Sequence, residues 1–167
     1  MNSIARNAVS KPQLAGPHAA AWAERLRKGN INPRTGLATD YLNHFNEAVM
    51  LLEMVPDMPE CAEDFLTWQP LSYCEHFMAS GFKARELAVE AYQRADPKIR
   101  AQFDHLADSM TSILTAVAKG LREAQHDDTR IRLAEQAVAW VKPLVGAAGG
   151  VINGDPQADV ESIMAGR

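Results

Sequence analysis

Residues 97–124, PKIRAQFDHLADSMTSILTAVAKGLREA, decide the fold class of this chain. Apolar side chains recur there at steps of three and four residues, at Ile99, Phe103, Leu106, Met110, Ile113, Val117, Leu121 and Ala124. This spacing is typical of a helix with one buried face. Asp96 and Pro97 predict its start, because Asp is a good N-cap and Pro fits the first helical position. A helix of about 28 residues is about 42 Å long, so we expect it to be the scaffold of the domain.

Similar spacing predicts the other helices of the chain. Three more long helices are expected over residues 40–55, 72–94 and 127–145, with shorter helices over residues 17–28 and 57–68. Gly81 interrupts the pattern over 72–94, where we expect another helix to approach closely. The glycines within 146–150 predict the end of the last helix. No alternation with a period of two indicates a strand. The sequence therefore predicts an all-α fold, an antiparallel bundle of four long helices with one or two short ones.

Composition is that of one globular domain. The chain has 167 residues, of which 47% are apolar and 23% are charged. We expect a mobile N-terminal arm over residues 1–16, a helical bundle domain over 17–150 and a flexible C-terminal tail over 151–167. No apolar run is long enough to cross a bilayer, and no apolar stretch of signal-peptide type follows Arg6 and Lys11. The expected location is the cytoplasm, without a membrane partner.

Charge is distributed unevenly along the chain. Residues 35–82 contain eight acidic side chains and no Lys or Arg, whereas residues 1–34 contain six basic side chains and one acid. One interpretation is that the two segments attract each other within the molecule. The other is that the acidic segment binds a cationic partner. The basic groups are few and clustered only in the N-terminal arm, which disfavours nucleic-acid binding.

Methionines are concentrated in the same acidic segment. Met50, Met54, Met58 and Met78 all lie there, and Met side chains form adaptable apolar surfaces. We therefore expect a non-enzymatic binding or regulatory protein that uses residues 41–82 to bind a partner protein or a basic amphipathic helix. A second copy of the chain, forming a homodimer, is one such partner. The candidate binding residues are Tyr41, His44, Glu47, Met54, Trp68, Tyr73 and His76.

A repeated phrase in the same segment supports an alternative. The pattern Tyr-x-x-His-Phe occurs at residues 41–45 and again at 73–77, each time near an expected helix start. If the two starts converge, His44, Glu47 and His76 supply two imidazoles and a carboxylate, a set that suits iron, zinc or manganese. This alternative is a metal-binding bundle, with an enzyme as one form of it.

Other features of the sequence oppose the metal alternative. A di-iron bundle uses Glu-x-x-His pairs on two helices, and the chain has none. The histidines are equally compatible with hydrogen bonds inside the bundle or at its rim. The spacing of Ser72 and Glu75 predicts a capping box, which gives Glu75 a structural role. We find no catalytic signature in the sequence.

Overall fold

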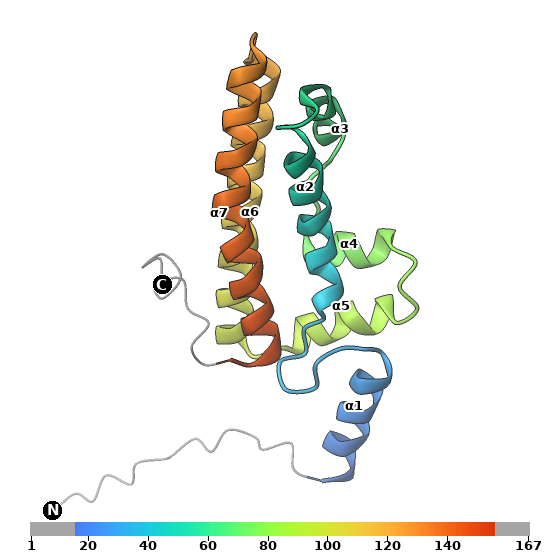
Figure 1. Ribbon diagram of the computed structural model, residues 1–167. Coiled ribbons are helices and arrows are strands. Elements are labelled where there is room, and N and C mark those ends of the chain that lie inside the picture. The colour runs from blue at the N-terminus through green and yellow to red at the C-terminus, as the bar shows by residue number, and fades with distance from the viewer. Residues whose placement is uncertain (1–15, 156–167) are drawn as a thin grey trace, which may run out of the picture.

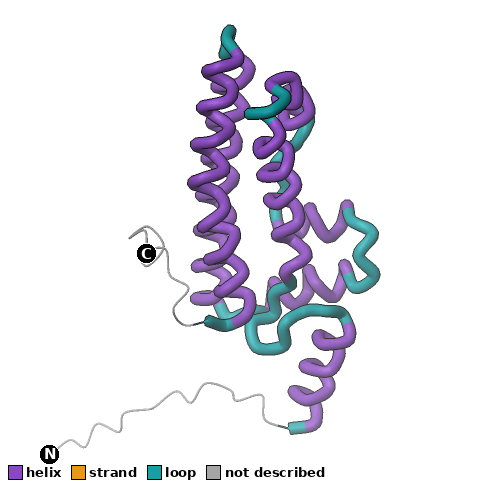
Figure 2. Tube along the Cα trace, viewed as in Figure 1, coloured by secondary structure: helices purple, strands orange, loops and turns teal. Residues whose placement is uncertain are grey.

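The computed structural model describes residues 16–155, and every regular element in that range is helical (Figures 1 and 2). The all-α class is confirmed. The elements in order are α1 (Pro17–Lys28), η1 (Thr39–Tyr41), α2 (Leu42–Met54), η2 (Pro59–Cys61), α3 (Ala62–Leu66), α4 (Tyr73–Ala79), α5 (Arg85–Arg94), α6 (Pro97–Glu123) and α7 (Asp127–Asn153). The expectations for residues 1–15 and 156–167 lie outside the described residues. None of the described helices combines the length and the apolar character that a membrane span requires.

Helices α6 and α7 form a hairpin that supports the rest of the fold. Each has 27 residues, and they run side by side with α2 packed along α7 (Figure 1). The predicted start of α6 is confirmed, because the backbone N–H of Lys98 donates to Asp96 Oδ1 at 2.8 Å. Most of the predicted stripe of α6 is buried, but Leu114 replaces Ile113 as the fully buried residue. A straight helix makes slightly fewer than two full turns in seven residues, so the buried face drifts around it.

Helix α7 extends beyond its predicted end. The glycines within 146–150 were expected to stop it, yet it continues to Asn153 and ends at Gly154, whose φ of 77° is left-handed. Val151 and Ile152 are buried, so packing outweighs the low helix propensity of glycine here. The expected boundary between domain and tail at residue 150 therefore falls inside a helix.

The helix predicted over residues 72–94 is two helices. The Ser80 hydroxyl donates to the Phe77 carbonyl at 3.0 Å and accepts the Phe82 N–H at 3.2 Å, which ends α4. After a short loop, α5 begins and folds back beside α4 as a projecting hairpin (Figure 1). The expected close approach of a helix at Gly81 is wrong, because no atom lies within 4 Å of the position of its missing Cβ. Over residues 16–155, two helices are long and the others have 13 residues or fewer.

Helix α1 lies at the opposite end of the molecule from α3 (Figure 1). It contacts α5, where the Arg94 guanidinium carbon lies 4.0 Å from the ring centroid of Trp22. The segment that follows α1 is anchored firmly, because the Thr35 hydroxyl donates to the carbonyl of Ile152 at 2.6 Å. This bond joins the α1–α2 connection to the end of α7.

Candidate functional site

The two copies of Tyr-x-x-His-Phe lie against each other where α2 and α4 begin. Their ring centroids are 5.3 Å apart for Tyr41 and Tyr73 and 6.1 Å apart for His44 and His76. The condition on which the metal alternative depends, that the two helix starts converge, is therefore met. We call this cluster of Tyr41, His44, Tyr73 and His76, together with its hydrogen-bond partners, the tyrosine–histidine clasp.

The first copy holds the backbone that leads into the second. The Tyr41 hydroxyl donates to the carbonyl of Leu71 at 2.7 Å, and the N–H of Leu71 donates to His44 Nε2 at 3.0 Å. Leu71, two residues before the start of α4, is thus fixed through both its N–H and its carbonyl group. A buried backbone group without a partner costs on the order of 1–3 kcal/mol, so these bonds set the position of α4.

The second copy holds the backbone that leads into the first. The N–H of Ala38 donates to the Tyr73 hydroxyl oxygen at 2.9 Å, and His76 Nε2 lies 3.0 Å from Asp40 Oδ2. A carboxylate oxygen only accepts, so the proton of this last pair lies on the histidine. The clasp is reciprocal, because each tyrosine and each histidine binds the approach to the other copy.

Burial changes the role of three candidate binding residues. Tyr41 is 2% exposed, Tyr73 4% and His44 6%. Because almost all of their surface is covered, they are not part of the exposed binding surface that the sequence predicted, and this expectation is corrected. Their side chains hold η1, α2 and α4 together.

His44 is neutral at pH 7. Burial, and secondarily the charge of His76, lower its pKa to about 4. Its Nε2 accepts the Leu71 N–H, so the proton of the neutral ring lies on Nδ1. Trp68 covers it with ring centroids 4.5 Å apart, and the indole N–H donates to the carbonyl of His44 at 3.0 Å. Trp68 is partly buried and supports α2 through these contacts.

These contacts do not support the alternative of an iron, zinc or manganese site. His44, Glu47 and His76 do line one cavity of about 240 Å³. However, both nitrogens of His44 are accounted for by the Leu71 bond and the ring proton, so it cannot ligate a metal without breaking that bond. Within residues 16–155, no group of three or more His, Cys, Asp or Glu side chains is placed to hold a metal ion.

Glu75 has the structural role that the sequence predicts. Its carboxylate accepts the Ser72 N–H at 2.9 Å, while the Ser72 hydroxyl oxygen accepts the Glu75 N–H at 3.1 Å. These bonds lower the pKa of Glu75, because they favour its charged form. The capping box is confirmed at the start of α4.

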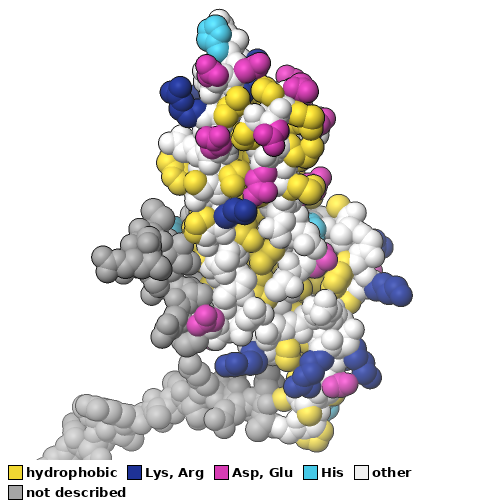
Figure 3. All heavy atoms as spheres, in the orientation of Figure 1, with side chains coloured by type: hydrophobic (Ala, Val, Ile, Leu, Met, Phe, Trp, Pro, Cys, Tyr) yellow, Lys and Arg dark blue, Asp and Glu magenta, His cyan; other side chains and the backbone are white. Residues whose placement is uncertain are grey.

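The outer side of α2 carries an exposed row of methionines. Met50 is 57% exposed, Met54 38% and Met58 43%, and their spacing of four residues places them along one side of the helix and the turn after it. Figure 3 shows acidic and hydrophobic side chains interleaved over this end of the molecule. We call Met50, Met54 and Met58 with the neighbouring Glu47, Glu53 and Asp57 the methionine face.

Most acids of this segment have no ion pair within residues 16–155. Glu53 pairs with Lys142 of α7 at 2.6 Å, Asp40 contacts His76, and Glu75 caps α4. The other five acids are exposed and form no ion pair with any described residue; they are Glu47, Asp57, Glu60, Glu63 and Asp64. Helix α1, which carries Arg25, Arg27 and Lys28, lies at the opposite end of the molecule from α3 (Figure 1), and these side chains form no ion pair with the five acids.

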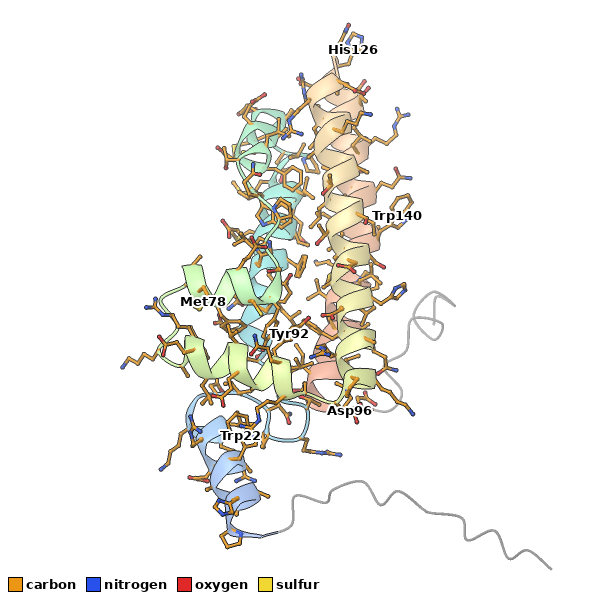
Figure 4. The ribbon with its side chains drawn as sticks, turned by 180° about the vertical axis from the view of Figure 1, so that it is seen from behind. Trp22, Met78, Tyr92, Asp96, His126 and Trp140 are labelled. Atoms are coloured by element: carbon orange, nitrogen blue, oxygen red, sulfur yellow. The ribbon has the colours of Figure 1, made fainter. Side chains whose placement is uncertain are left out.

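Two other exposed apolar residues lie away from the methionine face. Met78 is on the projecting α4–α5 hairpin, and Trp140 points outward from α7 on the side away from α2 (Figure 4). The grouping of Met78 with the α2 methionines is therefore corrected. The sequence analysis did not identify Trp140, although a Trp outside the inward stripe of Ala137, Val141 and Leu144 was an available signal.

Comparisons with models of protein families, with curated proteins and with solved structures find no match to this chain.

Proposed function

We propose that this chain is a non-enzymatic binding or regulatory protein whose methionine face takes a basic amphipathic helix of a partner protein. The observation that carries the proposal is the row of exposed Met50, Met54 and Met58 beside acids that have no ion pair among the described residues. Contiguous exposed apolar side chains rimmed by charge are typical of interaction sites.

The geometry of the row favours a helical partner. Residues four apart on a helix have Cβ atoms about 6 Å apart, so Met50 and Met54 give an apolar strip at the end of α2, and Met58 follows in the turn after the helix. An amphipathic helix presents anchors at the same spacing and packs along such a strip. Met side chains are unbranched and flexible, so they adapt to different partner side chains.

The surrounding charges favour a basic partner. Asp57 at the end of α2 and Glu60, Glu63 and Asp64 around α3 extend the negative field beyond the row. Lys or Arg side chains flanking the apolar face of a partner helix would complement these carboxylates. An acidic helix would be repelled at every approach to the row.

Titration calorimetry with a synthetic peptide tests this function. The probe is an 18-residue amphipathic Leu/Lys helix, and a peptide of the same composition with its periodicity scrambled is the control. We expect the helix to bind with a stoichiometry of one and the scrambled peptide to bind at least about tenfold more weakly, since only the helix aligns its apolar side chains.

Matched variants locate the contact. The double variant Met50→Ser, Met54→Ser should bind the helical peptide at least about tenfold more weakly, because apolar anchors at the centre of a contact dominate its energy. Met78→Ser removes an equally exposed methionine from α4 and should leave the affinity unchanged. Equal affinity for helix and scrambled peptide, or equal losses in the two variants, would contradict the proposed function.

A further inference from the structure

A second cavity lies on the other side of the clasp, among η1, α4, α5 and α6. It has a volume of about 240 Å³, and its walls include the rings of Tyr41, Tyr73, Tyr92 and Phe103. Figure 4 shows Tyr92 in the angle between α5 and α6. Three of these rings are buried in the core, so they form a fixed floor beneath a partly open site.

The hydroxyl groups at this cavity present lone pairs. The Tyr92 hydroxyl donates to Asp104 Oδ1 at 2.7 Å, and the Tyr41 hydroxyl donates to the carbonyl of Leu71. Each hydroxyl has one proton, so both oxygens can only accept a further hydrogen bond. The Tyr73 hydroxyl is turned toward the N–H of Ala38.

The charge at the cavity is negative. Asp104 and Asp108 on α6 both line it, and none of the described residues that line it is Lys, Arg or His. Burial, followed by the charge of Asp108, raises the pKa of Tyr41, so its hydroxyl keeps its proton. Arg100 does not line the cavity: its guanidinium carbon lies 5.6 Å from the centroid of the Tyr92 ring, and its N–H groups donate to the carbonyls of Tyr92 and Gln93.

We propose that this cavity binds a primary ammonium group, carried by a small amine or by a lysine side chain. An ammonium group has three donors and no acceptor, which matches a site of hydroxyl lone pairs and carboxylates. Aromatic walls attract cations further. An anion would be repelled by the carboxylates of Asp104 and Asp108. A neutral alcohol would not compensate their negative charge. The site is separate from the methionine face and independent of the function proposed for it.

Three probes of similar size test the ligand class on the full chain. The ¹H–¹⁵N spectrum is followed while butylammonium chloride, butan-1-ol or sodium butyrate is added. We expect saturable shifts around Tyr92 and Asp108 with butylammonium, and binding of the other two at least about tenfold weaker, because a charged hydrogen bond is lost. Equal affinities for the three probes, or shifts centred elsewhere, would overturn the proposal.

Variants with the same change of charge separate the cavity from a general field effect. Asp108→Asn changes an exposed residue of α6 and should weaken the binding of butylammonium at least about fivefold. Adding Asp104→Asn to this variant should weaken the binding further. Asp128→Asn, exposed on the first turn of α7, is the control and should bind as the parent does. If Asp128→Asn weakens binding as much as Asp108→Asn, the cavity is not the site.

A further arm distinguishes the two sources of the ammonium group. Nα-acetyl-lysine methylamide has the same head group on a peptide backbone. Affinity within about tenfold of butylammonium would assign the site to a lysine of a protein, whereas weaker binding would assign it to a free amine. Absence of binding by both compounds would overturn the proposal.

Discussion

The two sides of α2 have opposite characters, although the same 13 residues make both. On the inner side, Phe45 is fully buried, and His44 Nε2 accepts the N–H of Leu71 on the approach to α4. On the outer side, Met50 and Met54 are exposed, and Glu47 has no ion pair among the described residues. The hydrogen bonds of the clasp join α2 to the approach to α4, and the outer side of α2 is the surface that we propose binds a partner.

The largest contrast between the two sides is expected in stability. Phe45→Ala should lower the free energy of unfolding by about 3–5 kcal/mol, because it opens a cavity in the core. Met50→Ala, one and a half turns away on the outer side, should change it by no more than about 0.5 kcal/mol. Urea denaturation measures both, and similar losses would show that the outer side is packed.

Acid should weaken the inner side through His44. The pKa of His44 is 6.5 in an unfolded chain and about 4 in the folded protein. Between these values the unfolded chain binds the additional proton, so stability falls as pH decreases from 6.5 toward 4 and is retained above 6.5. The loss attributable to His44 is at most about 3.5 kcal/mol, at about 1.4 kcal/mol per unit of pKa.

A non-titrating variant isolates this loss. The side-chain oxygen of Gln in His44→Gln can accept the Leu71 N–H without taking up a proton in this range. We expect the unfolding free energy of His44→Gln to depend less steeply on pH between 6.5 and 4 than that of the parent. Parallel pH profiles for the two proteins would contradict the assignment.

The reciprocal hydrogen bonds predict a smaller effect on stability. Tyr73→Phe removes the acceptor of the buried Ala38 N–H and should cost about 1–3 kcal/mol. Tyr92→Phe is the same chemical change at a partly buried ring whose partner Asp104 is reached by water, so it should cost less than about 1 kcal/mol. Thermal unfolding measures the loss of stability in each variant. A larger loss in Tyr92→Phe than in Tyr73→Phe would contradict the structural role of the clasp.

Charge reversal sharpens the description of the outer side. Replacing Glu60, Glu63 and Asp64 together by Lys should mainly slow association of the basic helix. Charges at the rim of a contact affect the association rate more than the affinity. The parent's association should slow as salt increases, since charges more than about 8 Å apart are screened at physiological ionic strength. Stopped-flow association at two salt concentrations measures both effects. Association rates that change neither with salt nor with charge reversal would show that these acids take no part in binding.

The sequence predicted those features that depend on neighbouring residues. The limits of α6, the capping box at Ser72 and the helical class follow from local spacing and capping. The repeated phrase raised the convergence of His44 and His76 only as a condition of the metal alternative. The split between α4 and α5 was missed, because hydrogen bonds of the Ser80 hydroxyl outweigh a good helical pattern.

The partners of the clasp were beyond sequence reasoning. Leu71 and His44 are 27 residues apart, and His76 and Asp40 are 36 apart. Periodicity shows which side of a helix is apolar, but it does not show which distant backbone group will satisfy a polar atom. The candidate list therefore joined Tyr41 and Tyr73, which are buried, to Met54, which is 38% exposed.

The separation of roles across α2 is tested most directly by two variants studied in the same two assays. Dissociation of the basic amphipathic helix and the free energy of unfolding are measured for Met54→Ser and Tyr73→Phe. The account predicts faster dissociation with unchanged stability for Met54→Ser, and lower stability with unchanged dissociation for Tyr73→Phe at a temperature where it is folded. Unchanged dissociation for Met54→Ser, or faster dissociation for folded Tyr73→Phe, would contradict it.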